Sequence, residues 1–316
     1  MPFSEGYRRQ VTLLLRLLPP VAEEHCFALK GGTAINLFIR NLPRLSVDID
    51  LTYVPVSSRE ESLADIDAAM KRIVLRIRKA IPKAAVTPSI TKPENAVTKL
   101  VIRGGDAQVK IEVTPVLRGC VFEPTLRSVS AAVEESFGFA EIQVVSFADL
   151  YAGKIVAALD RQHPRDLFDI RDLLANEGID GMLRQAFVVY LLSHNRPMAE
   201  LLAPVRRPLE VEFARGFAGM TMASVAVQDL EAVRETLIAS IVGNMPEPHR
   251  HFLLSFERGE PDWSLLGIAA ASELPAVRWR QRNLDLLDIE ARALLVAKLE
   301  RSLFRTIART GPSDAK

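Results

Sequence analysis

Two aspartates stand two residues apart on an apolar segment near the start of the chain. In the stretch SVDIDL, Asp48 and Asp50 alternate with apolar residues, so on a strand both carboxylates project to the same side. Adjacent ionised carboxylates repel each other, and a hard divalent cation such as Mg²⁺, which binds through carboxylate oxygens, relieves that repulsion. The pattern indicates a metal site, although a half-buried strand with a solvated face shows the same alternation.

A glycine turn upstream of the aspartates offers donors for phosphate. Gly31-Gly32-Thr33 follows a short apolar run, residues 27–29, and opens a stretch that is predicted to be helical to Arg40. Backbone N–H groups at a turn that opens a helix bind phosphate, and Thr33 adds a hydroxyl group. Metal-binding carboxylates and a phosphate cradle in one region predict phosphoryl or nucleotidyl transfer.

A third carboxylate stands on another alternating segment. Residues 107–114, the second strand of a predicted hairpin, place Lys110, Glu112 and Thr114 on one side. If this strand pairs beside the strand of the two aspartates, Glu112 joins the same site. Three carboxylates can hold one or two Mg²⁺ ions, which neutralise the charge of a triphosphate. In the alternative interpretation the three polar residues line a solvated face.

Two predicted helices further along carry a second dense group of charges, in the segment DLYAGKIVAALDRQHPRDLFDIRD. On the first, Lys154 and Arg161 fall on one stripe beside small alanines that permit close approach of an anionic ligand. On the second, Asp166 and Asp169 share a face, and Arg165 can pair with Asp169. The alternative is two amphipathic helices with surface ion pairs of little energetic value.

The order of the predicted elements gives an α+β protein. Strands are predicted at 27–29, 45–54, 96–103, 107–114 and 141–146, and helices at 11–21, 33–40 and 58–79. Pro19-Pro20 are expected to end the first helix, and helices dominate from about residue 147. We expect an α+β domain at 1–145 and a helical region at 146–316, with a short tail at 311–316.

Composition limits the possible classes of protein. The chain has 316 residues and a formal charge of +1, so it is not a strongly basic nucleic-acid binder by bulk charge. Its two cysteines, Cys26 and Cys120, make a disulfide framework implausible and favour a reducing cytoplasm. No apolar run approaches the length of a membrane span, so we expect a soluble cytoplasmic protein that does not bind a membrane.

Taken together, these motifs resemble the AbiEii/AbiGii-type toxin family of nucleotidyltransferases, within the DNA polymerase beta-like superfamily. The superfamily pattern of a glycine turn, Asp-x-Asp and a later carboxylate is matched by Gly31-Gly32-Thr33, Asp48-Ile49-Asp50 and Glu112. A second family motif is matched, with Arg in place of the usual Lys at position 165, by Lys154, Ala157, Arg161, Arg165, Asp166 and Asp169. Arg44, Ser46 and the segment LPAVRWRQRNL at 274–284 also resemble the family.

The resemblance implies an N-terminal nucleotidyltransferase-type mixed sheet with flanking helices, and a helical region that completes the nucleotide and acceptor site. It implies that Mg²⁺ or Mn²⁺ is bound by Asp48, Asp50 and Glu112. The residues that it assigns to catalysis are Asp48, Asp50, Glu112, Lys154 and Asp166. Those that it assigns to the NTP are Gly31, Gly32, Thr33, Ser46, Lys154, Arg161 and Asp169.

The resemblance further implies a toxin with a cognate antitoxin, and an NTP from which NMP passes to a tRNA acceptor with release of pyrophosphate. Two basic segments could contact RNA: residues 71–79, with five Lys and Arg, and residues 278–282, with Trp279 among three Arg. A small-molecule or protein hydroxyl is an alternative acceptor. A non-catalytic protein that binds its partner through the helical half is the remaining alternative.

Overall fold

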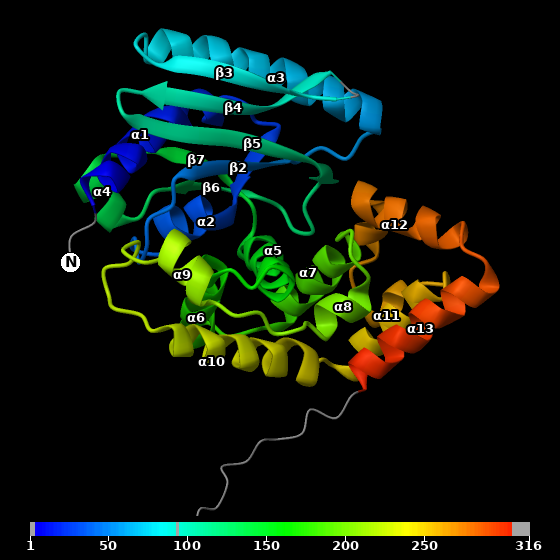
Figure 1. Cartoon of the computed structure of the whole chain (residues 1–316). Helices are drawn as coiled ribbons and strands as arrows, with labels where there is room; N and C mark the ends of the chain where they lie inside the picture. Colours follow the sequence, from blue (N-terminus) through cyan, green and yellow to red (C-terminus); the bar gives the residue numbers. More distant parts are fainter. Residues whose placement is uncertain (1–3, 93–94, 305–316) are drawn as a thin grey trace, which may run out of the picture.

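The fold is built on a seven-stranded mixed sheet with the strand order β3-β4-β5-β2-β1-β7-β6 (Figure 1). It was obtained as a computed structural model, in which residues 4–92 and 95–304 are described. The expected tail at 311–316 lies outside these ranges. The strands are β1 (Phe27–Lys30), β2 (Asp48–Tyr53), β3 (Ala85–Thr91), β4 (Ala96–Gly104), β5 (Ala107–Arg118), β6 (Thr125–Ser128) and β7 (Glu141–Val144).

The strand that carries the two aspartates lies in the middle of the sheet. It pairs in parallel with β5 on one side and antiparallel with β1 on the other. The expected hairpin is present, because β4 and β5 pair antiparallel through the turn at 104–107. The expected α+β class with a mixed sheet is therefore confirmed.

The two faces of β2 meet different helices. Tyr53 donates to Asp65 at 2.9 Å on helix α3 (Arg59–Ala80), so the odd-numbered residues of β2 face α3 and α1 (Glu5–Ala22). The even-numbered residues face α2 (Gly31–Ala34), because an added Cβ at Gly31 would lie 2.6 Å from Oδ2 of Asp50. The aspartates therefore point away from the layer formed by α1 and α3. Figure 1 shows α3 on one side of the sheet and helices α5 to α8 on the other.

Helix α3 begins where the sequence places its start. Ser58 accepts a hydrogen bond from the backbone N–H of Glu61 at 3.2 Å, and the Glu61 carboxylate accepts one from the N–H of Ser58 at 3.2 Å. This reciprocal capping box satisfies two N–H groups that have no partner within the helix. Apolar residues on one side of α3, among them Ile66, Ile73 and Ile77, are fully buried against the sheet.

The remaining helices lie mostly beyond the last strand. They are α4 (Ala131–Phe137), α5 (Phe147–Asp160), α6 (Pro164–Asn176), α7 (Gly181–Leu192), α8 (Met198–Leu202), α9 (Glu210–Gly216), α10 (Val227–Ile238), α11 (Glu247–Glu257), α12 (Pro275–Asp285) and α13 (Ile289–Leu303). One hydrophobic cluster runs from Val11 to Leu303 and joins the sheet to these helices. The division at 145/146 stays a prediction. In the ranges that the structure covers, no helix combines the length and the apolar character needed to cross a bilayer.

Three features of the fold differ from the sequence-based expectations. Helix α1 continues through Pro19 and Pro20 to Ala22. Each proline removes one backbone donor but keeps φ near the helical value, and burial of Leu17 and Leu18 holds this turn against the core. Strands β3 and β6 were not expected. Both are largely exposed strands at opposite edges of the sheet, so they lack the apolar alternation that marks a half-buried strand.

Candidate active site

Four charged side chains form a row across the middle of the sheet. Asp50 on β2 is paired with Glu112 on β5 and with Lys30 on β1, and Glu112 is paired in turn with Lys99 on β4. Lys99 Nζ lies 3.1 Å from Oε2 of Glu112. The strand pairing on which the place of Glu112 depended is therefore present, and a lysine flanks the two carboxylates on each side.

Electrostatic conditions at Asp50 disfavour its ionised form. Burial raises its pKa, and Asp48 and Glu112 raise it further, while Lys30 and Lys154 act in the opposite direction without cancelling the shift. Burial also lowers the pKa of the Lys30 ammonium, against the attraction of Asp50. Burial, with the two neighbouring carboxylates, therefore outweighs the two lysines at Asp50.

The carboxylates fit a hard divalent cation in chemistry. Oxygen donors on Asp48, Asp50 and Glu112 suit Mg²⁺ or Mn²⁺, and a cation would offset both the burial and the carboxylate repulsion that raise the pKa of Asp50. Across residues 4–92 and 95–304, however, no three His, Cys, Asp or Glu side chains are already gathered as metal ligands. Glu112 contacts Lys99 through Oε2.

The glycine turn touches the aspartate strand directly. Gly31 has φ +75°, and a Cβ there would lie 2.6 Å from Oδ2 of Asp50. A Cβ on Gly32 would lie 2.8 Å from Nη2 of Arg44 and 3.0 Å from Oγ of Ser46. Only glycine permits this approach at Gly31, since its backbone is left-handed as well as crowded. The two glycines therefore bring the turn against the carboxylate and the arginine.

The hydroxyl groups near the turn are engaged within the protein. Thr33 is fully buried, donates to the carbonyl oxygen of Asp48 and has its Oγ1 3.1 Å from Oγ of Ser46. These contacts fasten the start of α2 to the start of β2. The hydroxyl of Thr33 thus fixes the position of the backbone that carries Asp48.

Behind the turn lies a buried network that joins α5, α6 and the loop before β2. Arg44 holds Asp169 with two hydrogen bonds, from Nε to Oδ1 at 2.8 Å and from Nη2 to Oδ2 at 2.6 Å. Lys154 Nζ lies 2.8 Å from Oδ1 of Asp166 and 3.0 Å from Oδ2 of Asp169. Arg161 reaches Asp166 from the surface at 2.6 Å. Apart from Arg161, these side chains are at most 7 % exposed.

The network keeps its carboxylates ionised. Burial alone would raise the pKa of Asp166, but Lys154 and Arg161 outweigh it and hold that pKa well below the usual range. The same balance, with Arg44 as the strongest cation, lowers the pKa of Asp169. Such buried charges persist because they are paired and hydrogen-bonded. The sequence-based pairing of Asp169 with Arg165 is wrong, because Arg44 and Lys154 take both of its oxygens.

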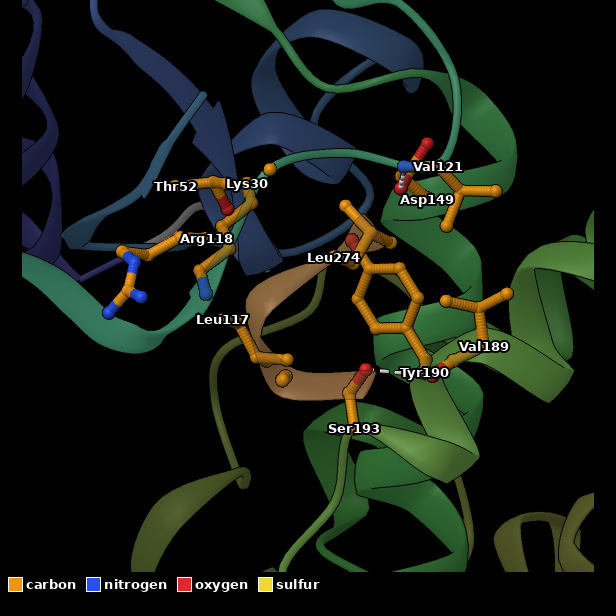
Figure 2. Close-up of a pocket in the computed structure, with 12 residues that line it drawn as sticks. Lys30, Thr52, Leu117, Arg118, Val121, Asp149, Val189, Tyr190, Ser193 and Leu274 are labelled. Atoms are coloured by element: carbon orange, nitrogen blue, oxygen red, sulfur yellow. Dashed lines mark hydrogen bonds between the residues drawn. The ribbon is translucent and has the colours of Figure 1, made fainter. Parts of the chain in front are cut away.

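A narrow pocket adjoins the charged row (Figure 2). Its lining includes Lys30 and Thr52 from the sheet, Tyr190 from α7 and Leu274 from the segment before α12. Asp149 fixes one wall, because it accepts hydrogen bonds from the N–H groups of Val121 at 2.8 Å and Phe122 at 3.0 Å. The pocket therefore links the sheet end of the site to the C-terminal helices.

The charge row includes residues that sequence reasoning did not select. Lys30 ends an apolar strand beside the glycine turn, and its Nζ lies 3.4 Å from Oγ1 of Thr114 on β5. Lys99 and Asn36 were also missed; Asn36 donates to the carbonyl oxygen of Gly32 at 2.8 Å. The apolar run before the glycines was a usable signal for Lys30, because a charged residue that ends a buried strand points into a site or to solvent. No local pattern marks Asn36 or Lys99.

Comparison with known proteins gives a family and a fold. Residues 12–282 match the model of the family described as nucleotidyl transferase AbiEii toxin, type IV TA system. The structure is similar to MenT4, a nucleotidyltransferase toxin from Mycobacterium tuberculosis H37Rv, with a TM-score of 0.59 and 16% sequence identity. The similarity covers 92% of this chain and 94% of that chain. None of the curated proteins matches the sequence.

Proposed function

The chain belongs to the AbiEii family of nucleotidyltransferase toxins, and we propose that it transfers NMP from an NTP to a tRNA hydroxyl with release of pyrophosphate. The family's toxins act within type IV toxin–antitoxin systems, so a cognate antitoxin is its partner. The observation that carries the proposal is the pairing of Asp50 with Glu112, with Asp48 on the same face and the glycine turn against Asp50.

Asp48, Asp50 and Glu112 are the residues that would hold the divalent cation, which we propose to be Mg²⁺ or Mn²⁺. When bound, it neutralises triphosphate charge and polarises the reacting oxygens. In the reaction an acceptor oxygen forms a bond to the α-phosphorus. The bond between the α-phosphorus and the oxygen that bridges it to the β-phosphate breaks, and pyrophosphate leaves. The hydroxyl proton passes to solvent.

We assign the phosphates of the NTP to the turn at Gly31-Gly32-Thr33, next to Ser46. The turn presents backbone N–H groups beside Asp50, where the metal-bound phosphates would lie. Two of the three donors of the Lys154 ammonium are engaged by aspartates, which leaves one to reach a phosphate oxygen. The partly exposed guanidinium of Arg161 is a further contact for the nucleotide.

Asp166 and Asp169 act in this proposal as positioning residues. Both are 1 % exposed and bind cations within the protein, so neither presents a free oxygen to substrate. Asp166 orients Lys154 and Arg161, and Asp169 fixes Arg44 behind the glycine turn. Positioning and charge stabilisation supply most of the acceleration in reactions of this kind.

Labelled NTPs test the proposed acceptor. The protein is incubated with each NTP, a divalent cation, and in turn tRNA, a protein extract freed of nucleic acid, or a set of small hydroxyl compounds. Label that migrates with tRNA, with an equal amount of pyrophosphate, supports the proposal. Label on protein or on a small molecule, with none on tRNA, would show that the acceptor is a protein or small-molecule hydroxyl and not tRNA. The cytoplasmic location, predicted from the two cysteines, stays a prediction.

A further inference from the structure

Beyond Glu112, the face of the sheet that carries the site is open. Glu112 and Lys110 on β5 are exposed. Their neighbours in sequence point the other way and are buried; Ile111 and Val113 are at most 1 % exposed. The acceptor must approach from this open side, because the glycine turn and α5 close the other side of Asp50.

Helix α12 continues this open face from the end of β5. Leu274, which precedes α12, packs on Gly119 just after β5, where a Cβ would lie 2.6 Å from its Cδ2. Leu274 and Ala276 line the same pocket as Lys30 (Figure 2). Leu117, near the end of β5, lines this pocket as well, so the end of the strand leads from the carboxylates to this helix.

The outer stripe of α12 has the composition of a stacking platform. Arg278, Trp279 and Arg282 are spaced so that they share one helical face, and the Trp279 side chain is 55% exposed. Arg278 pairs at the surface with Glu273 at 3.0 Å, with both side chains more than half exposed. The exposed side chain of Arg282 makes no hydrogen bond or ion pair within residues 4–92 and 95–304. Arg280, in contrast, turns inward and donates to the carbonyl oxygen of His194 at 2.9 Å.

The other basic segment, residues 71–79 on α3, lies away from the site. On α3, Lys71 pairs with Asp67 at 2.6 Å and Arg72 with Glu24 at 2.6 Å. This helix also covers the opposite face of the sheet from Asp50. An acceptor lying on α3 would therefore have to pass around the edge of the sheet to reach the carboxylates. Of the two basic segments, only α12 adjoins the open side.

We propose that the strip formed by Lys110, Arg278, Trp279 and Arg282 binds an unpaired segment of the RNA acceptor, with one base stacked on Trp279. Arginine and lysine contact phosphates, and an exposed indole stacks on a base of any identity. An unpaired segment is required because the bases of a duplex are already stacked on each other. The inference rests on the proposed function for its acceptor class and adds the residues that hold it.

Binding of a fluorescein-labelled single-stranded RNA of twelve nucleotides to the full chain tests the proposal, measured by anisotropy at several salt concentrations. Trp279→Ala weakens binding by about tenfold, as expected for loss of one stacked base, while Trp279→Phe, which keeps a ring, restores most of it. Arg282→Ala lowers the slope of log Kd against log salt by about 0.7, the value for one phosphate contact on a single strand. Arg78→Ala on α3 is the matched control and leaves the slope unchanged.

Three results would contradict RNA binding by the strip. The first is that both Trp279→Ala and Arg282→Ala bind the RNA with wild-type affinity. The second is that the wild type binds a duplex of the same sequence equally well. The third is that Trp279→Ala loses binding to the purified antitoxin while its affinity for RNA is unchanged. If Trp279→Ala fails to fold, the salt slope of Arg282→Ala decides. Asp48→Asn should bind the RNA normally and lose NMP transfer. Absence of NMP transfer by the wild type, with intact RNA binding, would contradict the proposed function and not the strip.

Discussion

Asp50 and Glu112 are paired across the parallel strands β2 and β5, and Lys30 faces Asp50 from the other side. Parallel pairing places both carboxylates on the open face of the sheet at the same height. Lys99 and Lys30 supply positive charge at the two ends of the row, so the protein tolerates the carboxylates before a metal binds.

Replacement of Gly31, compared with replacement of Gly105, should separate the effect of backbone strain from the effect of displacing Asp50. Gly31→Ala puts a Cβ at 2.6 Å from Oδ2 of Asp50 and also strains a φ of +75°. We expect a loss of about 1–2 kcal/mol in the free energy of unfolding from the left-handed backbone, and loss of nucleotide transfer. Gly105→Ala is the matched control, because its φ is +62° with nothing within 4 Å. Gly105→Ala should lose stability and keep its transfer rate. Equal transfer rates in the two variants would contradict the idea that the added Cβ at Gly31 displaces Asp50.

Asp166→Asn should destabilise the protein in a pH-dependent way. Removing one partner from a buried ion pair costs about 3 kcal/mol. Since the folded-state pKa of Asp166 lies well below its usual range, its contribution is fully present above about pH 4, the ordinary Asp value, and is lost as the pH falls below it. Urea unfolding should therefore show a penalty at pH 7 that shrinks progressively below about pH 4 and is clearly smaller at pH 2.

The matched control for Asp166 lies on the same helix. Asp172 pairs with Arg171 at 3.0 Å near the surface, so Asp172→Asn should cost less than about 1 kcal/mol at either pH. A penalty for Asp166→Asn that is as small as this, or that grows toward acid pH, would show that the buried network does not stabilise the fold as described.

Lys30→Met should weaken nucleotide binding. The ammonium of Lys30 is the cation next to Asp50 on β1, so its removal lowers the positive charge near the metal-bound triphosphate. Two unit charges a few ångströms apart near a protein surface interact by a few kcal/mol, and we expect about a tenfold rise in the Kd for a non-hydrolysable NTP with Mn²⁺, measured by calorimetry. Lys83→Met, at an exposed lysine in the loop after α3, should leave that Kd unchanged. An unchanged Kd for Lys30→Met would remove Lys30 from the site.

The sequence was sufficient for the central strand and the parts next to it. Alternation in SVDIDL fixed which side Asp48 and Asp50 share, and the capping box at Ser58 marked the start of α3. The pairing of β2 with β5 followed from no local signal, because strand order depends on packing of the whole sheet. Glu112 was assigned to the site through the family motif, and on the condition that its strand pairs beside the strand of the two aspartates.

The partners of the charged helices were harder to predict. Arg44 and Asp169 are 125 residues apart in sequence and meet only because the loop before β2 packs on α6. Helical periodicity within one segment could suggest only the neighbour Arg165. Edge strands β3 and β6 were missed for a related reason, since their exposure leaves no apolar pattern. Sequence patterns therefore do not predict contacts between distant segments, nor elements that bury little apolar surface.

One measurement tests the central claim most directly. Wild-type protein and Asp48→Asn are incubated with total tRNA, Mg²⁺ and each labelled NTP, and both labelled RNA and pyrophosphate are quantified. The account predicts transfer from a preferred NTP by the wild type, with one pyrophosphate for each NMP attached, and a loss of at least a hundredfold in Asp48→Asn, of the order seen when a catalytic electrostatic group is removed. Full activity in Asp48→Asn would contradict the assignment of the site.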